Sequence, residues 1–389
     1  MAVNKMRSDL LFWLACLLLA TGNALGADPA APGKKLPSVT PSHELAGALP
    51  AEKWGQVERS VDRALAWLAL QQASDGSFPT RDVAQPAVTS FCVLAFLSRG
   101  HQPGSGPYGK QLERAIDFVL SCQKKDGLLC YNAPGPYWQF EEASHTGSYN
   151  HAIAGLMLGE VYGQVSGNRA KMVRRAIEKA LQFTRALQTR SKPEADKGGW
   201  GYLRAQGGEL DGDLSVTAWQ LMFLRSARNA EFKVPKEYAD EAVSYIRRNW
   251  DPAQGAFLYH RQAGSTRGMM GAGILSLSMA GQHQSEIAQT AGQWLLDHPF
   301  KRFGESYGEF DRYYYSMFYC SQAAAQLGGR FWNGIYPSVV DTILNSQEAD
   351  GACPPEPNRG DVVFGQAYST SLAVLALTPA YQLLPVYQR

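Results

Sequence analysis

A short motif recurs at the ends of predicted helices, and it constrains the fold more than any other feature of the chain. It reads QQASDGSF at residues 71–78, QKKDGLL at 123–129 and QEADGAC at 347–353. Looser versions lie between the second and third of these. The motif glycines are spaced by 51, 72, 56, 49 and 47 residues, and they are Gly76, Gly127, Gly199, Gly255, Gly304 and Gly351. Regular recurrence indicates repeated supersecondary units. The chain therefore contains six units, with an insertion in the third.

Each unit has two predicted helices of different character. The helix before the loop is amphipathic, with one apolar stripe at helical spacing. The helix after the loop is apolar nearly all round, as in residues 87–97 and 269–280, so we expect it to be buried on every side. Six alternations of half-exposed and buried helices predict an all-α (α/α)6 toroid with two concentric rings. The expected stripes include Val61, Leu65 and Leu68; Leu112, Ile116 and Val119; Val173, Ile177 and Leu181; and Tyr336, Val340 and Ile343.

The recurrent motif itself is interpreted as structural. Its glycine accepts a left-handed conformation that ends the outer helix. The acid before the glycine accepts backbone N–H groups in the turn. The glutamine at the helix end, and the aromatic residue that follows the glycine in most units (Phe78, Trp200, Phe257), tie one hairpin to the next.

The N-terminal residues are predicted to lie outside the folded domain. Lys5 and Arg7 precede an apolar run over residues 10–20, and small residues follow, which is typical of a secretory signal peptide over residues 1–26. Residues 27–50 are rich in proline and alanine and predict a linker. The toroid domain is expected over residues 51–389. We therefore expect a secreted or periplasmic protein with no stable membrane anchor after signal cleavage.

Charge and cysteine content narrow the function classes. A pI near 8.1 without a basic cluster argues against nucleic-acid binding. Removal of the signal peptide leaves five cysteines at irregular spacing, which is no disulfide framework. Cys122 and Cys130 flank one motif loop, and they are either a disulfide pair or buried free thiols.

The motif also resembles the repeats of the prenyltransferase and squalene-cyclase superfamily, which form an α/α toroid. The resemblance covers about residues 54–389 and is strongest to secreted bacterial members, in residues 313–332 and 368–389. Triterpene cyclases of this superfamily use a D-x-D-D-T-A motif, whose final aspartic acid protonates an alkene. The similar stretch here is DGDLSVTAWQ, in which Thr217 and Ala218 match, while Ser215 and Val216 replace the last two acids. Only Asp213 remains, with Asp211 displaced.

Protein prenyltransferases of the superfamily hold zinc with Asp, Cys and His. Tyrosines occupy the histidine's place in DRYYYSMFYC, and no D-x-C sequence accompanies it. The sequence therefore predicts no metal site and no other cofactor.

We expect the inner helices to start on one side, so that their N-termini converge on one mouth and favour anions there. The catalytic candidates near these starts are Asp213, Asp211, His151, Asp311 and Tyr314. Each has a structural alternative. The aspartates are also common helix caps, a buried histidine is commonly a hydrogen-bonded core residue, and Tyr313–Tyr315 also suits ring packing. Further polar residues near the starts are Thr89, Ser90, His145, Tyr149, Asn150, Arg267, Arg312, Tyr368 and Ser369.

Three functions fit these patterns. The first is binding, or transformation, of an isoprenoid or another apolar or polyene molecule in a central cavity. The second is a carbohydrate-active toroid that uses paired carboxylates, with Asp213 and Asp311 as acid and base on a glycan. The third is a non-enzymatic exported binding or scaffold protein.

Overall fold

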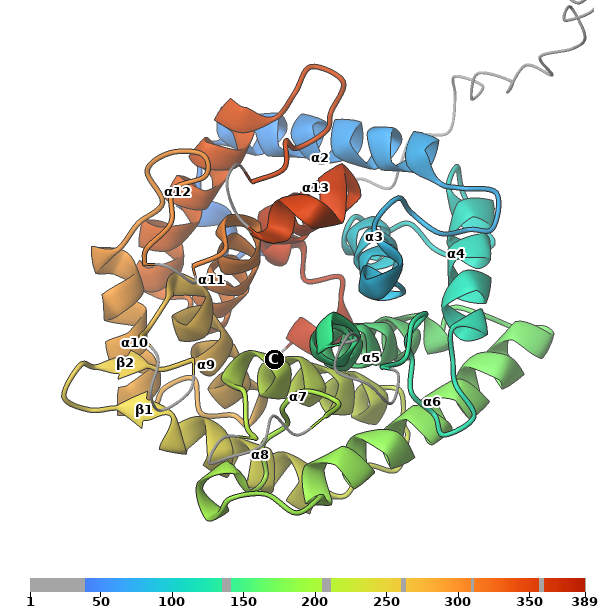
Figure 1. Cartoon of the computed structure of the whole chain (residues 1–389). Helices are drawn as coiled ribbons and strands as arrows, with labels where there is room; N and C mark the ends of the chain where they lie inside the picture. The colour runs from blue at the N-terminus through green and yellow to red at the C-terminus, as the bar shows by residue number, and fades with distance from the viewer. Residues whose placement is uncertain are drawn as a thin grey trace, which may run out of the picture. The chain divides into compact units, whose positions relative to one another are not determined.

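Twelve helices make up most of the chain that a computed structural model describes, namely residues 39–134, 141–204, 211–259, 264–308, 311–356 and 360–388. They alternate between an outer and an inner ring (Figure 1). The outer helices are α2 (Ala51–Gln71), α4 (Gly109–Ser121), α6 (Gly167–Thr189), α8 (Lys236–Arg248), α10 (Glu286–Asp297) and α12 (Gly329–Ser346). The inner helices are α3 (Ala87–Ser98), α5 (Glu141–Tyr162), α7 (Leu214–Asn229), α9 (Arg267–Met279), α11 (Tyr313–Leu327) and α13 (Gly365–Leu377).

The inner ring is continuous. Each inner helix contacts the inner helices on either side of it, and α13 contacts α3 to complete the circle. All twelve residues of α3 are buried, as its uniform apolarity predicts. Strands are confined, among the described residues, to a small hairpin of β1 (Trp250–Asp251) and β2 (Ala256–Phe257). The (α/α)6 toroid predicted from the sequence is therefore confirmed.

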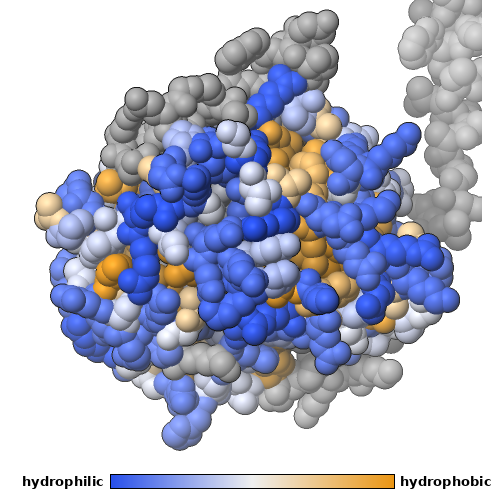
Figure 2. All heavy atoms as spheres, turned by 90° about the horizontal axis from the view of Figure 1, so that it is seen from below, coloured by the Kyte–Doolittle hydropathy of each residue, from blue (hydrophilic) through white to orange (hydrophobic). Residues whose placement is uncertain are grey.

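Each outer helix buries its apolar stripe and exposes its opposite face. In α2, Val61, Leu65 and Leu68 are buried, and charged residues occupy the outward face. Figure 2 views the domain from the side, where hydrophilic residues cover most of the surface and apolar residues show in small patches. No helix among the described residues has the length and apolarity needed to cross a membrane.

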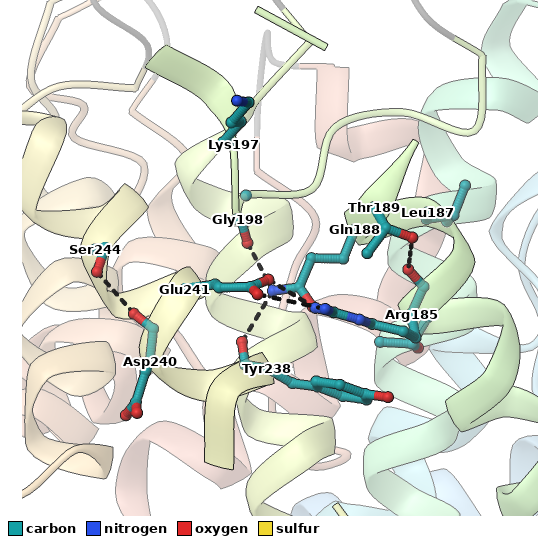
Figure 3. A network of polar contacts seen from close by, with 12 residues as sticks. Arg185, Leu187, Gln188, Thr189, Lys197, Gly198, Tyr238, Asp240, Glu241 and Ser244 are labelled. Carbon is teal, nitrogen blue, oxygen red and sulfur yellow. Dashed lines mark hydrogen bonds and ion pairs between the residues drawn. The ribbon is translucent and has the colours of Figure 1, made fainter. Parts of the chain in front are cut away.

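The recurrent glutamines join neighbouring hairpins. The Nε2 of Gln188 donates to the carbonyl oxygen of Gly198 in its own loop and to that of Tyr238 in α8, both at 2.9 Å (Figure 3). Gln72 and Gln123 make the same pair of bonds, each to the next outer helix. The expected role of the motif glutamine as a tie between hairpins is therefore present in the structure.

The motif glycine and acid act in the turn after the helix rather than at its last residue. Helix α2 ends at Gln71, whereas Gly76, with φ of 94°, lies further along the loop. In the third unit the residue with positive φ is Gly198, not Gly199 as the sequence spacing indicated. Asp75 accepts the N–H of Ser77 at 2.9 Å, as the motif predicts.

The structure moves the start of the domain and decides between the two alternatives for Cys122 and Cys130. The folded unit begins at Val39, because Leu45 is buried and its carbonyl oxygen accepts the indole N–H of Trp332 at 2.7 Å. Residues 39–50 of the expected linker therefore lie on the domain. Cys122 and Cys130 are buried free thiols, and burial raises their pKa values to about 12 and about 11.

Candidate functional site

A central cavity of about 460 Å³ lies where the inner helices begin. Every inner helix contributes at least one residue from or beside its first turns, which agrees with the expected convergence on one mouth. The wall is largely apolar, and its polar groups come from tyrosine, serine and threonine hydroxyls, the amide of Asn150, His145 and Arg312. The lining includes Val88 and Phe91 (α3), His145, Tyr149 and Ile153 (α5), Ser215 (α7), Met269 (α9), Arg312 and Tyr315 (beside and in α11), and Phe364 and Tyr368 (beside and in α13).

Aromatic rings pack behind part of the cavity wall. Trp219 is fully buried, stacks on Phe318 with ring centroids 5.2 Å apart, and meets the edge of Phe91 at 5.4 Å. Phe318 in turn contacts Tyr387 of η7 (Pro385–Tyr387), so ring contacts run from the cavity wall to the C-terminal segment. Gln326 of α11 donates to the carbonyl oxygen of Tyr387 at 2.6 Å and holds this segment inside the ring (Figure 1).

A cluster of hydroxyl groups forms one side of the cavity. Tyr149 and Ser215 share a short hydrogen bond through their hydroxyl oxygens. Ser215 donates to the Oδ1 of Asp213 at 2.7 Å, so the carboxylate lies behind the serine and not on the wall. Tyr202 and Tyr259 are joined through their hydroxyls at 2.6 Å.

The phenols of this cluster are weaker acids than tyrosine in water. Burial raises the pKa of Tyr149 well above its ordinary value, and the negative charge of Asp213 raises it further. Burial and Asp213 likewise raise the pKa values of Tyr202 and Tyr259. Since the ordinary pKa is already about 10, these hydroxyls stay protonated at neutral pH and can donate hydrogen bonds to a ligand.

Asp213 is the N-cap of α7. Its Oδ1 accepts the N–H of Val216 at 2.9 Å, which is the capping role that the sequence left open. The same carboxylate also accepts Ser215, so capping and contact with the hydroxyl cluster occur together. Val216 and Ser215, the two positions that resemble the last acids of D-x-D-D-T-A, supply an apolar side chain and a hydroxyl.

Asp211 is engaged away from the cavity wall. Both of its oxygens accept hydrogen bonds from Arg190, with Nε 2.8 Å from Oδ2. Arg190 also donates to the carbonyl oxygens of Leu203 and Tyr202. The pair therefore connects the end of α6 to residues 202–203 and to Asp211, and Asp211 does not line the cavity.

His151 lies between helices with both ring nitrogens engaged. Its Nδ1 accepts the N–H of Leu129 at 3.2 Å, and Nε2 lies 2.9 Å from the hydroxyl of Thr184. Burial lowers its pKa to about 3. Thr89 and Thr217 accept the equivalent loop N–H groups, those of Phe78 and Trp200, in their own units. His151 thus takes the place of a structural threonine.

Asp311 and Tyr314 are also directed away from the cavity. Asp311 is fully buried and forms an ion pair with Arg267 at 2.8 Å. It accepts Ser316 Oγ and a loop N–H, so it does not cap α11. Tyr314 donates to the carbonyl oxygen of Pro354 at 2.9 Å. The neighbouring Tyr315 is the member of the run that lines the cavity.

Two cavity tyrosines, Tyr202 and Tyr259, were not among the sequence candidates. Each follows a buried motif aromatic, Trp200 or Phe257, by two residues. That spacing places side chains on the same side of an extended segment, so the motif contained the necessary signal. Within the described part of the chain, no three His, Cys, Asp or Glu side chains are grouped so that they could hold a metal ion.

Comparison with known proteins shows the fold. No protein-family model and no curated protein matches the chain in sequence. The type II terpene cyclase MstE from Scytonema has a similar structure, with a TM-score of 0.55 and 14% identity over 85% of this chain and 99% of the cyclase. A glycosidase has a TM-score of 0.55 and 11% identity over 86% of this chain and 100% of its own chain. An alpha-amylase from Clostridium perfringens has a TM-score of 0.53 and 12% identity over 82% of this chain and 97% of its own. The domain therefore has the α/α-toroid fold that these proteins share.

Proposed function

We propose that the protein binds an isoprenoid or another apolar molecule in its central cavity. The supporting observation is the lining, in which side chains beside the starts of the inner helices form a mainly apolar wall around about 460 Å³. This is within the usual size range of small-molecule sites. MstE has been seen with geranylgeranyl dihydroxybenzoate, so a toroid of this fold can hold a prenyl chain.

The hydroxyl cluster suits the polar end of such a ligand. Tyr149 and Ser215 lie on the same wall as the apolar side chains, and the phenol remains protonated. A phenol with a raised pKa is a poor proton donor to an alkene, because that step needs a strong acid. The chemistry of the wall therefore favours binding over a cyclisation that begins with protonation. If a more reactive ligand undergoes acid–base chemistry here, a proton would move along the hydrogen bonds that connect Tyr149, Ser215 and Asp213.

The carbohydrate-active alternative ranks second. Glycoside cleavage ordinarily uses two carboxyl groups that face the sugar. Asp213 lies behind Ser215, and Asp311 is paired with Arg267, so neither of the two candidates faces the cavity. No other carboxylate appears among the described lining residues.

Export is part of the same proposal. The charged and apolar pattern of residues 1–26 supports a cleaved signal peptide, and the binding function would then operate in the periplasm or outside the cell. The intact mass of the protein purified from its own host tests this, since cleavage predicts a chain that begins near residue 27.

The binding proposal is tested by native mass spectrometry of the purified protein with solvent extraction of bound molecules. The protein is then titrated with geranylgeraniol and with a maltooligosaccharide while its tryptophan fluorescence is recorded. Trp219 is a suitable reporter because its ring contacts Phe91 of the cavity wall. Trp219→Phe shows whether Trp219 is the tryptophan that reports binding. Tyr149→Phe removes a wall hydroxyl, and Tyr162→Phe, outside the cavity lining, is the matched control.

We expect geranylgeraniol to bind and to change the fluorescence of the wild type but not of Trp219→Phe. Tyr149→Phe should weaken binding severalfold, consistent with loss of one hydrogen bond, and Tyr162→Phe should not. A protein that binds only the sugar supports the carbohydrate hypothesis. A protein that binds neither defeats the proposal and leaves the scaffold hypothesis.

A further inference from the structure

A second pocket, of about 480 Å³, lies in the outer part of the domain between α7, α8 and the end of α9. It shares no lining residue with the central cavity. Leu221, Leu224 and Val243 form part of an apolar floor. The remaining wall is strongly cationic, with four basic side chains and a single carboxylate. These residues are Arg225, Arg228, Lys236, Arg247 and Asp240.

The single carboxylate already forms an ion pair. Asp240 pairs with Lys236 of the same helix at 2.7 Å. Arg247 donates to the amide oxygen of Gln282 at 2.6 Å, which leaves its charge uncompensated. The Nε of Arg225 is buried without a hydrogen-bond partner among the described residues.

Several arginines elsewhere in the domain are neutralised by carboxylates. Arg185 pairs with Glu241, Arg190 with Asp211, and Arg267 with Asp311. The formal net charge of the chain is only +2, so the excess around this pocket is local. A buried guanidinium N–H without an acceptor is costly, and an anion in the pocket would remove that cost.

We propose that this pocket binds a small phosphate-bearing anion. Guanidinium groups match phosphate oxygens in geometry and form charge-assisted hydrogen bonds with them. Arg225, Arg228 and Arg247 form no ion pair with a carboxylate in the described part of the chain, which favours a ligand with several negative charges over a monocarboxylate. The proposal is independent of what the central cavity holds.

Calorimetric titration of the purified protein with inorganic pyrophosphate, phosphate and acetate tests the proposal. Arg225→Gln and Arg228→Gln remove single charges from the pocket. Arg330→Gln is the matched control, because Arg330 donates to the neutral Gln293 on a different part of the outer ring. Thermal unfolding of each variant confirms that it is folded. Sedimentation with phosphatidylcholine vesicles, with and without phosphatidic acid, separates a free phosphate from a lipid headgroup.

We expect pyrophosphate to bind more tightly than phosphate, acetate not to bind, and each pocket variant to weaken pyrophosphate binding by roughly tenfold. Arg330→Gln should bind as the wild type does. Binding to phosphatidic acid vesicles that the pocket variants lose would assign the anion to a lipid headgroup. The proposal is overturned if folded wild-type protein binds neither pyrophosphate nor these vesicles, or if the pocket variants bind as well as the control.

Discussion

The side-chain amide of Gln347 donates to the backbone carbonyl oxygen of Ser60 at 2.9 Å and thereby joins the last outer helix to the first. The same amide donates to Gly351 at 2.9 Å. Gln72, Gln123 and Gln188 make the equivalent bonds between consecutive units. The joint at Gln347 differs because it connects opposite ends of the chain, so one repeated contact both links neighbours and closes the ring.

Replacing Gln347 with alanine should destabilise the domain by about 2–4 kcal/mol, because it removes the two bonds that the amide donates and the two that its Oε1 accepts from Ser60 Oγ and Arg63. Gln71→Ala is the matched control, because the Gln71 amide reaches only a carbonyl of its own helix, at 3.5 Å. Urea unfolding gives both values. Equal effects of the two substitutions would contradict the joining role of Gln347.

The glycine of the same joint allows no side chain. Gly351 has φ of 101°, and an added Cβ would lie 2.4 Å from the carbonyl oxygen of Arg63 in α2. Gly351→Ala should therefore cost about 2 kcal/mol or more, through backbone strain and displacement of α2. Gly163→Ala is the control, because nothing lies within 4 Å of its added Cβ. Similar unfolding free energies for the two variants would show that the joint is not tight.

The sequence predicted the toroid because helical periodicity and motif spacing are local properties that repeat. The cavity residues were harder to predict, because proximity to a helix start does not give the direction of a side chain. Tyr314 and Tyr315 are adjacent, yet one contacts the loop before α13 and the other lines the cavity. Asp211 pairs with the half-buried Arg190 and Asp311 with the buried Arg267, and no local sequence pattern reveals either partner.

Substitution of His151 tests directly whether this residue has a structural or a catalytic role. Its substitution by alanine leaves the buried N–H of Leu129 without an acceptor and opens a cavity beside Phe183 and Phe223, at a cost of about 3 kcal/mol. His151→Thr supplies the acceptor used in other units and should cost less. Both variants, once folded, should bind the central ligand with unchanged affinity. Loss of binding or activity in a folded His151→Thr protein would restore the functional assignment.

Glu160 should make the stability of the domain depend on pH. It is buried on α5 and accepts hydrogen bonds from Ser226 Oγ at 2.6 Å and from the N–H of Val386 in the C-terminal segment at 3.4 Å. Burial raises its pKa from 4.5 to about 7. The carboxyl of Glu160 therefore binds its proton more tightly in the folded state than in the unfolded state. The stability that protonated Glu160 contributes is complete below pH 4.5 and is lost as the pH rises through 7.

Glu160→Gln keeps a neutral hydrogen-bonding group and should remove this dependence. We expect the variant to match the wild type near pH 4.5 and to exceed it by up to about 3 kcal/mol at pH 8. Because the pKa of His151 is lowered, its own contribution falls as the pH drops below 6.5 and opposes that of Glu160. The difference between the unfolding free energies of wild type and Glu160→Gln across pH isolates the glutamate. A difference that stays constant with pH would show that Glu160 does not titrate in this range.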